Sequence, residues 1–384
     1  MPPTIKRKLG RVILAAIGLP LAAGLARGQP SWTDFSYTNW NPGTAPAIPG
    51  ASAERHYDNR IVWDGEKFVT IQEGTRTGDY TYYYVASSRG QTDWGTPVAL
   101  DIPRLWDCAH HALACAPDGF PPSDVAWAEQ SQNVRYKLWY SSSEGYNHFR
   151  YGESTDGVYW HPSFLEYDYC PPTYKLDPNK CMIKPDVLYR PEGSAALDPE
   201  HPMDNRYICY LGAANSAGDP SYFEMYISSN GLDWKLHAWD GYCQARWAAS
   251  TSGPAEVSEF VAFTGYDTTY YYYFHPAYYN LGSVEEVYEN GERQGFLLWV
   301  DAYVQDHSIQ SFYSTDGLRW TAREQPVGAI GSIGAAGAWN GTRNYGFDSV
   351  RLGESYFILR NGLYNTGAAV RKGRLSAEVE TPGS

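Results

Sequence analysis

The chain has 384 residues, of which 43% are hydrophobic, 16% aromatic and 19% charged, and its formal net charge is −13. A disordered chain would be poor in aromatic residues and rich in charge, so this composition indicates a folded protein. Tyrosine and tryptophan favour pleated strands over helices, and a negative net charge without a basic patch argues against a nucleic-acid partner. The length allows two ordinary domains or one large all-β domain.

Residues 1–28 have the pattern of an export signal. Four basic residues between positions 6 and 11 precede an apolar run over residues 12–25, and small residues at 26 and 28 suit cleavage. The apolar run is too short to span a bilayer, so we interpret it as a secretory signal rather than a membrane anchor. We therefore expect a secreted or periplasmic protein without a membrane span in its mature part, which forms a single domain over residues 29–384.

Six cysteines lie in the expected mature chain, at positions 108, 115, 170, 181, 209 and 243. An even number of cysteines in an oxidising compartment favours disulfides. Proximity in sequence suggests the pairs Cys108–Cys115 and Cys170–Cys181, which leaves Cys209–Cys243, but six cysteines allow many other pairings. The absence of Cys-x-x-Cys disfavours a metal site.

Four segments share a turn signature that ends in tryptophan. They span residues 88–94, 154–160, 229–234 and 314–320. Asp-Gly or Asn-Gly, present in three of them, is a strong hairpin signal because both residues tolerate positive φ. The tryptophans are 66, 74 and 86 residues apart, and a hairpin repeated at such spacing predicts propeller blades with long loops. We interpret the signature as structural, with the tryptophan packed on a neighbouring blade.

Each signature follows a strand rich in tyrosine and phenylalanine, and another strand is expected before that one. The aromatic strands are expected at 80–86, 136–141, 222–228 and 296–302, and the inner strands at 58–65, 124–127, 185–189 and 275–279. A fifth unit, from 348–352 through 356–359, lacks its own tryptophan hairpin, and the stretch 32–40 can supply its outer strand. The sequence therefore predicts an all-β, five-bladed β-propeller whose ring is closed by an N-terminal strand.

Aspartates recur at matching or near-matching registers of the expected inner strands: Asp58, Asp124, Asp186 and Asp348. Inner strands line the axis of a propeller, so we expect these side chains to converge on one opening. Carboxyl groups that are brought together repel, which keeps one or more protonated near neutral pH and separates an acid from a base. Glycoside hydrolysis needs that division. The alternative is that each aspartate accepts hydrogen bonds from loop amides at a strand entrance.

The segments Asp58…Trp63-Asp64-Gly65 and Lys184-Pro185-Asp186-Val187-Leu188-Tyr189, with the Ser-Thr-Asp-Gly-x-x-Trp hairpins, resemble the five-bladed-propeller glycoside hydrolases. That group includes arabinanases, xylosidases, arabinofuranosidases, levanases and invertases. The resemblance implies Asp58 as base or nucleophile, Asp186 as the residue that tunes pKa and orients the sugar, and a glutamate near blade four as the acid. Glu256 and Glu259 lie between the expected blades three and four, and Glu256 is the candidate acid. The expected blade-four strand departs from the group's pattern, with Ala277 at the register of a glutamate, so either the loop supplies the acid or the propeller has lost its activity.

Aromatic rings stack on sugars, and arginine donates paired hydrogen bonds to hydroxyl or carboxylate groups. The candidates for sugar binding are Asp124, Trp127, Arg246, Trp247, His275, Trp339, Tyr345 and Asp348. The alternative for each aromatic residue is packing between blades. We therefore hypothesise a secreted glycoside hydrolase that acts on a poly- or oligosaccharide, and the alternative is a propeller that binds polysaccharide without cleaving it.

The sequence lacks the short motifs of common catalytic metal and nucleophile sites. Neither His-Glu-x-x-His nor Gly-x-Ser-x-Gly occurs, so zinc chemistry and an α/β-hydrolase nucleophile are not expected. We expect no cofactor. A Ca²⁺ ion in the axial channel, where carboxylates cluster, is left open as an alternative.

Overall fold

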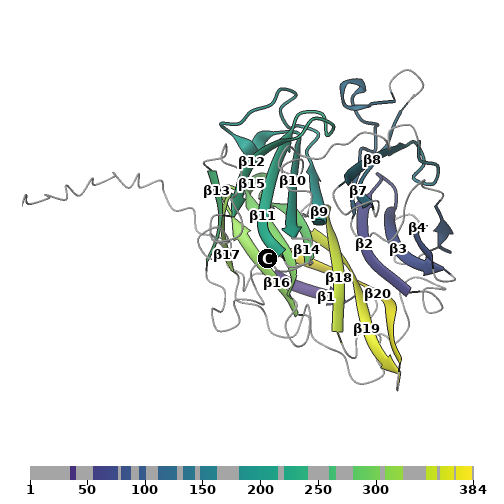
Figure 1. The fold of residues 1–384 in the computed structure, drawn as a ribbon. Helices are drawn as coiled ribbons and strands as arrows, with labels where there is room; N and C mark the ends of the chain where they lie inside the picture. The colour runs from purple at the N-terminus through teal and green to yellow at the C-terminus, as the bar shows by residue number, and fades with distance from the viewer. Residues whose placement is uncertain are drawn as a thin grey trace, which may run out of the picture.

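The computed structural model describes residues 35–39, 55–76, 79–87, 95–100, 111–127, 133–142, 148–161, 181–214, 220–240, 259–264, 280–302, 308–322, 343–352, 355–366 and 369–382. The regular elements of this part are β-strands and two single-turn 3-10 helices, Pro122–Asp124 and Pro202–Asp204. The sheets lie around a common centre as in a β-propeller (Figure 1). Within the described residues, the structure contains no helix with the length and apolar character needed to cross a membrane.

The described strands form four hydrogen-bonded sheets. The first contains β2 (Arg55–Trp63), β3 (Phe68–Arg76), β4 (Asp79–Ala86) and β5 (Val98–Ala99). The second contains β6 (His111–Cys115), β7 (Tyr136–Ser142) and β8 (His148–Ser154). The last contains β18 (Arg343–Leu352), β19 (Ser355–Thr366), β20 (Ala369–Pro382) and β1 (Phe35–Asn39).

The remaining sheet has nine strands. One antiparallel run comprises β9 (Cys181–Tyr189), β10 (Tyr207–Ala214), β11 (Pro220–Ser228) and β12 (Lys235–Asp240). A second comprises β14 (Asn280–Glu289), β15 (Glu292–Ala302), β16 (Ser308–Ser314) and β17 (Arg319–Ala322). Between them lies β13 (Glu259–Thr264), which pairs in parallel with both β12 and β17. The sequence predicted separate sheets for these two runs, and the structure differs because β13 joins them.

The first strand of each antiparallel run lies toward the centre of the molecule. These inner strands contact one another in order, β2 with β6, β6 with β9, β9 with β14 and β14 with β18, and β18 contacts β2. Figure 1 shows β2, β9, β14 and β18 near the middle of the view. At the opposite side of the last sheet, β1 pairs with β20 in antiparallel register. The stretch 32–40 was expected to provide a strand at this position.

The predicted aromatic strands agree with the structure, whereas the predicted inner strand at 124–127 does not. Strands β4, β7, β11 and β15 cover the four aromatic segments within a few residues. The expected inner strand at 124–127 is wrong, because proline at the start of Pro122–Asp124 favours a 3-10 turn, and β6 is the inner strand instead. Residues 275–279 lie outside the described part, and the strand at the centre is β14.

Three of the four turn signatures form the same turn, and residues 88–94 lie outside the described part. In the turn after β8, Ser154 Oγ accepts a hydrogen bond from the amide of Gly157 (2.8 Å). Asp156 Oδ1 accepts hydrogen bonds from the two amides that follow Gly157 (both 2.8 Å). The same bonds recur in the turns that begin at Ser228 and Ser314.

These turns connect neighbouring antiparallel runs of strands. Trp139 Nε1 of β7 donates to the carbonyl of Gly231 (2.9 Å), and its ring lies 6.0 Å from that of Trp234. The hydroxyl of Tyr210 in β10 donates in the same way to the carbonyl of Gly317 (2.8 Å). The prediction that the signature is structural is therefore confirmed for these two turns.

The core consists of apolar layers between neighbouring sheets. One cluster extends from β6 to β17 and includes Trp139, Tyr207, Met225, Phe312 and Trp320. A second cluster joins β2–β4 to β6 and β7 and includes Val69, Ile71, Leu113, Leu138 and Tyr140. Burial of aromatic side chains on both faces of a sheet supplies most of the free energy that holds it in place.

The expected disulfides are not formed at the cysteines whose side chains are described. Cys115 and Cys209 have free thiols, so the predictions Cys108–Cys115 and Cys209–Cys243 are wrong. Cys115 ends inner strand β6, and Cys209 is buried in β10. Proximity in sequence assumed cysteines in neighbouring loops, whereas these two lie within sheets. The other cysteines, including the side chain of Cys181, lie outside the described part.

We expect Gly231→Ala to destabilise the protein more than Gly291→Ala. Both glycines have positive φ, +73° and +77°, so both substitutions cost about 1–2 kcal/mol in backbone conformation. A Cβ on Gly231 would also lie 3.0 Å from the Tyr207 ring and 3.1 Å from that of Trp139, whereas one on Gly291 meets nothing within 4 Å. This overpacking adds roughly 1–3 kcal/mol. The free energies of unfolding in urea give the comparison, and equal losses would contradict the docking role of the Gly231 turn.

Candidate functional site

A cavity of about 140 Å³ lies where the inner strands meet. Its wall is formed by Ile61–Trp63 of β2, Leu113–Cys115 of β6, Asp186–Tyr189 of β9, Ser283–Glu285 of β14 and Asp348–Val350 of β18. Most of these residues are apolar. Three carboxyl-bearing residues, Asp186, Glu285 and Asp348, therefore reach one cavity from three different strands.

Asp186 and Asp348 each bind a backbone amide of a neighbouring inner strand. Asp186 Oδ2 accepts a hydrogen bond from the amide of Val284 in β14 (2.6 Å). Asp348 Oδ2 accepts one from the amide of Ile61 in β2 (2.6 Å). An edge strand presents N–H groups that its own sheet does not pair, and a buried unpaired N–H is costly. The two aspartates thus join β9 to β14 and β18 to β2.

The buried side chain of Arg60 lies beside these carboxyl groups. Its Nη1 is 3.4 Å from Asp348 Oδ1, its Nη2 donates to the carbonyl of Pro185 (3.0 Å), and its Nε donates to that of His111 (2.6 Å). One guanidinium therefore links β2 to β6, β9 and β18. Among the described residues, no group of three or more His, Cys, Asp or Glu side chains is placed to hold a metal ion.

Burial raises the pKa of all three carboxyl groups at the cavity. For Asp348, burial is the largest cause, the charge of Arg60 opposes it, and the nearby Asp186 raises the pKa further. For Asp186, burial again raises the pKa and Arg60 opposes it. The pKa of Glu285 is raised well above its ordinary value by burial, then by Asp348 and Asp186. The cluster therefore retains protons at a pH where isolated carboxyl groups are ionised, as a general acid requires.

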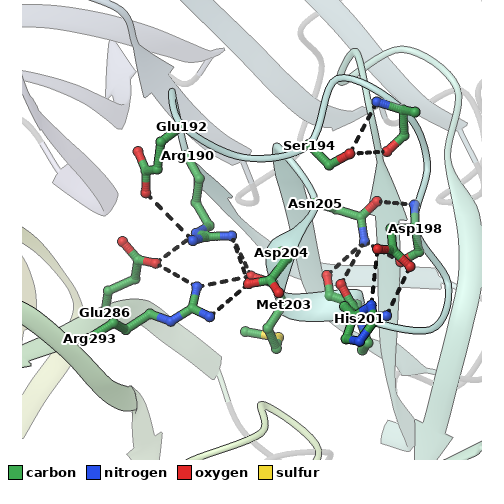
Figure 2. Close-up of polar contacts among 12 residues, drawn as sticks. Arg190, Glu192, Ser194, Asp198, His201, Met203, Asp204, Asn205, Glu286 and Arg293 are labelled. Atoms are coloured by element: carbon green, nitrogen blue, oxygen red, sulfur yellow. Dashed lines mark hydrogen bonds and ion pairs between the residues drawn. The ribbon is translucent and has the colours of Figure 1, made fainter.

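Glu285 and its neighbour Glu286 lie on opposite sides of β14, as successive strand residues do. Glu286 Oε1 accepts a hydrogen bond from Arg190 Nε (2.7 Å) and lies 3.4 Å from Arg293 Nη1. Figure 2 shows these two arginines between Glu286 and Asp204. Glu286 is therefore bound by two guanidinium groups that connect the two antiparallel runs of the nine-stranded sheet. Glu285 lies at the cavity instead.

The structure does not bring Asp124 to the cavity. Both oxygens of its carboxylate accept hydrogen bonds from Arg206 Nη1 (3.0 Å each). Its Oδ2 also accepts a hydrogen bond from the hydroxyl of Tyr207 (2.9 Å). These contacts link the second sheet to β10. The expectation of an axial Asp124 is therefore wrong, because this residue ends a 3-10 helix after β6 rather than opening an inner strand.

Trp127 also lies away from the cavity wall. Its amide donates to Glu153 Oε2 (3.0 Å), and its ring centroid is 4.2 Å from that of His161. The half-buried ring packs on its own blade, which is the structural alternative to sugar binding considered for the aromatic candidates.

Several predicted site residues cannot be placed. Asp58 belongs to β2, where the register shifts between His56 and Asn59, and Tyr345 belongs to β18, but both side chains lie outside the described part. The remaining candidates, Arg246, Trp247, Glu256, His275 and Trp339, lie wholly outside it. The roles assigned to these residues stay predictions.

Glu285 is the cavity residue that sequence reasoning missed. The blade-four strand was sought at 275–279, before the true inner strand. Asn290 and Gly291 have φ of 53° and 77°, which forms the two-residue hairpin turn between β14 and β15. This Asn-Gly pair was the available signal, because reading back from it along the strand reaches Glu285.

Comparison with solved structures shows the same fold in proteins that act on or bind carbohydrate. An N-acetylgalactosamine deacetylase from F. plautii, solved with blood group B trisaccharide, is 15% identical with a TM-score of 0.53, over 88% of this chain and 94% of that one. A GH62 hydrolase solved with xylotriose is 13% identical with a TM-score of 0.52, over 88% and 99%. A glycosyl hydrolase from Bacteroides ovatus is 11% identical with a TM-score of 0.51, over 92% and 95%.

No protein-family profile and no curated protein matches the sequence. At identities of 11–15% the similarity to the solved structures shows the fold alone. The chain is an all-β propeller.

We expect Glu285→Gln to flatten the pH dependence of stability. Because the pKa of Glu285 is raised in the folded state, the folded protein binds a proton that the unfolded chain releases above about pH 4.3. The wild type therefore loses stability as the pH rises from there to the folded pKa, and the variant lacks this loss. The difference in Tm between variant and wild type should become more positive by about 2 °C or more from pH 5 to pH 8.

Thermal unfolding followed by circular dichroism measures this difference. The matched control is Glu289→Gln, which removes a carboxylate from an exposed position at the end of the same strand. Parallel Tm curves for wild type and Glu285→Gln between pH 5 and pH 8 would contradict a raised pKa.

Proposed function

We propose that this protein is a carbohydrate-active enzyme that hydrolyses glycosidic bonds in a poly- or oligosaccharide. The observation that carries the proposal is the meeting of Asp186, Glu285 and Asp348 at one cavity, with pKa values raised by burial. Glycoside hydrolysis requires one protonated and one ionised carboxyl group. The propeller neighbours support the substrate class, because two of them were solved with oligosaccharides.

The proposal treats the molecule as a five-bladed propeller. The two antiparallel runs of the nine-stranded sheet count as separate blades, because each begins with a strand at the cavity. The closed sequence of contacts among β2, β6, β9, β14 and β18 supports that count. The pairing of β1 with β20 supports closure of the ring by the N-terminal strand.

In the proposed reaction Glu285 is the general acid. Its carboxyl group donates a proton to the glycosidic oxygen as the bond from that oxygen to the anomeric carbon breaks. Asp58 of β2 is the proposed base or nucleophile. As a base it takes a proton from the water whose oxygen bonds to the anomeric carbon. As a nucleophile its carboxylate first bonds to that carbon, and a water then displaces it and gives its proton to Glu285. Asp186 and Asp348 keep the pKa of Glu285 high, so that it holds its proton before the reaction. Glu256 is retained as the second candidate for the acid.

The alternative function is recognition of a polysaccharide without cleavage. It is favoured by the hydrogen bonds of Asp186 and Asp348 to amides of neighbouring strands, because these bonds explain both carboxyl groups by the stability of the ring alone. Asp186 would then stabilise the ring, and the cavity would lie beneath a binding surface.

Incubation with arabinan, xylan, levan and glycans that contain N-acetylgalactosamine tests the proposal. We expect the wild type to release reducing ends from one of these substrates. Glu285→Gln and Asp58→Asn should each lower kcat by about 100-fold or more, because each removes a proton-transfer group. Glu289→Gln, on the exposed end of β14, should leave kcat unchanged.

The other outcomes of this assay are distinguishable. Retention of a polysaccharide without release of reducing ends would support the binding function. Release of acetate without reducing ends would indicate deacetylation, the reaction named for the F. plautii neighbour. Full activity of Glu285→Gln together with loss of activity in Glu256→Gln would assign the acid to Glu256.

We further propose that residues 1–28 direct export and are then removed. The basic start, short apolar run and small residues near position 28 support this. N-terminal sequencing of protein recovered from the periplasm or medium should begin at about residue 29. Recovery only from the cytoplasm, with Met1 or Pro2 at the N-terminus, would contradict export.

A further inference from the structure

Two serines connect Glu285 to the neighbouring inner strand. Ser349 Oγ of β18 donates a hydrogen bond to Glu285 Oε1 (3.3 Å). Ser283 Oγ of β14 lies 2.6 Å from Ser349 Oγ. Both serines are buried, and both line the cavity. The three side chains therefore form a continuous hydrogen-bonded chain between β14 and β18.

The direction of this chain follows from counting protons. A serine hydroxyl has a single hydrogen to donate and can accept through its lone pairs. When Ser349 donates its hydrogen to Glu285, it can only accept from Ser283. The order of donation toward an ionised Glu285 is therefore Ser283 to Ser349 to Glu285.

We propose that Ser349, oriented by Ser283, is a positioning residue for Glu285. Ser349 binds Oε1 and leaves Oε2 as the oxygen that carries the transferable proton. The catalytic meaning of this arrangement rests on the proposed hydrolase function. The hydrogen-bonded chain itself does not depend on it.

The hydroxyl group has a different effect from the charged groups around it. Among the described residues, the charged and titratable groups near Glu285 on the packed inner strands are Asp186 and Tyr189 on β9, Asp348 and Arg351 on β18, Arg60 on β2 and Cys115 on β6. The two aspartates raise the pKa of Glu285, and Ser349 lowers it. A hydrogen bond to the ionised form stabilises the carboxylate that remains after proton transfer. Ser349 thus keeps the pKa of Glu285 low enough for its carboxyl group to donate a proton.

The contrast with Glu286 shows why a hydroxyl suits this role. Arg190 and Arg293 bind Glu286 through groups whose charge is permanent. Ser349 carries no charge, so Glu285 can be protonated and ionised in turn while its position is held.

Infrared difference titration of the purified protein between pH 4 and pH 10 tests the inference. The signal is the carbonyl band of a protonated carboxyl group that disappears in Glu285→Gln. We expect Ser349→Ala to raise the midpoint of this band by about one pH unit, because one hydrogen bond to the carboxylate is lost. Ser283→Ala should raise it by less, because Ser349 remains.

Two variants serve as controls. Ser349→Thr keeps the hydroxyl and should preserve the wild-type midpoint. Ser311→Ala removes a buried serine on β16 that does not line the cavity, and it should also preserve the midpoint. An unchanged midpoint in folded Ser349→Ala would overturn the inference. If that variant does not fold, an unchanged midpoint in Ser283→Ala overturns it.

This titration needs no substrate, so it separates the inference from the proposed function. A raised midpoint in a protein that cleaves no glycan would support the role of Ser349 toward Glu285 and refute hydrolysis. In an active enzyme, the alkaline limb of kcat should move upward with the midpoint in Ser349→Ala, with little change in KM. An alkaline limb of kcat that stays in place while the midpoint moves would show that Glu285 is not the acid. The proposal that Ser349 positions a catalytic acid would then be wrong.

Discussion

The structure depends on how the unpaired edges of its inner strands are satisfied at the axis. A sheet that ends at the centre of a propeller presents backbone amides that its own strands cannot pair. Asp186 binds one such amide on β14, and Asp348 binds one on β2. These bonds cross from sheet to sheet, so they hold the inner strands against one another. They also place carboxyl groups where water is largely excluded.

The same burial that holds the aspartates at the axis raises the pKa values of the carboxyl groups at the cavity. Asp186 and Asp348 are kept near the axis by their amide bonds, and both raise the pKa of Glu285. Arg60 limits the cost of burying the aspartates, because its guanidinium opposes the rise in their pKa values. The structural contacts and the proposed chemical roles therefore fall on one set of residues. Substitution of either aspartate would disturb both, so activity loss alone cannot identify a catalytic group there.

The adjacent glutamates Glu285 and Glu286 on β14 have different surroundings. Glu286 faces the arginines that join the two antiparallel runs of the nine-stranded sheet. Glu285 faces the cavity and a serine hydroxyl. The alternation of a β-strand places them on opposite sides, so one side chain contacts two arginines and the other contacts a serine hydroxyl at the cavity. Nothing in their chemistry as isolated side chains distinguishes them.

Local sequence was sufficient for the turns and for much of the strand pattern. Asp-Gly and Asn-Gly determine backbone conformation within a few residues, so the turns at 154–160 and 314–320 could be predicted, and Asp186 and Asp348 fell on strands at the axis. Which strand of a blade lies innermost was decided only by tertiary structure, because it depends on contacts between strands far apart in the chain. For that reason Asp124 was assigned to the axis and Glu285 was not.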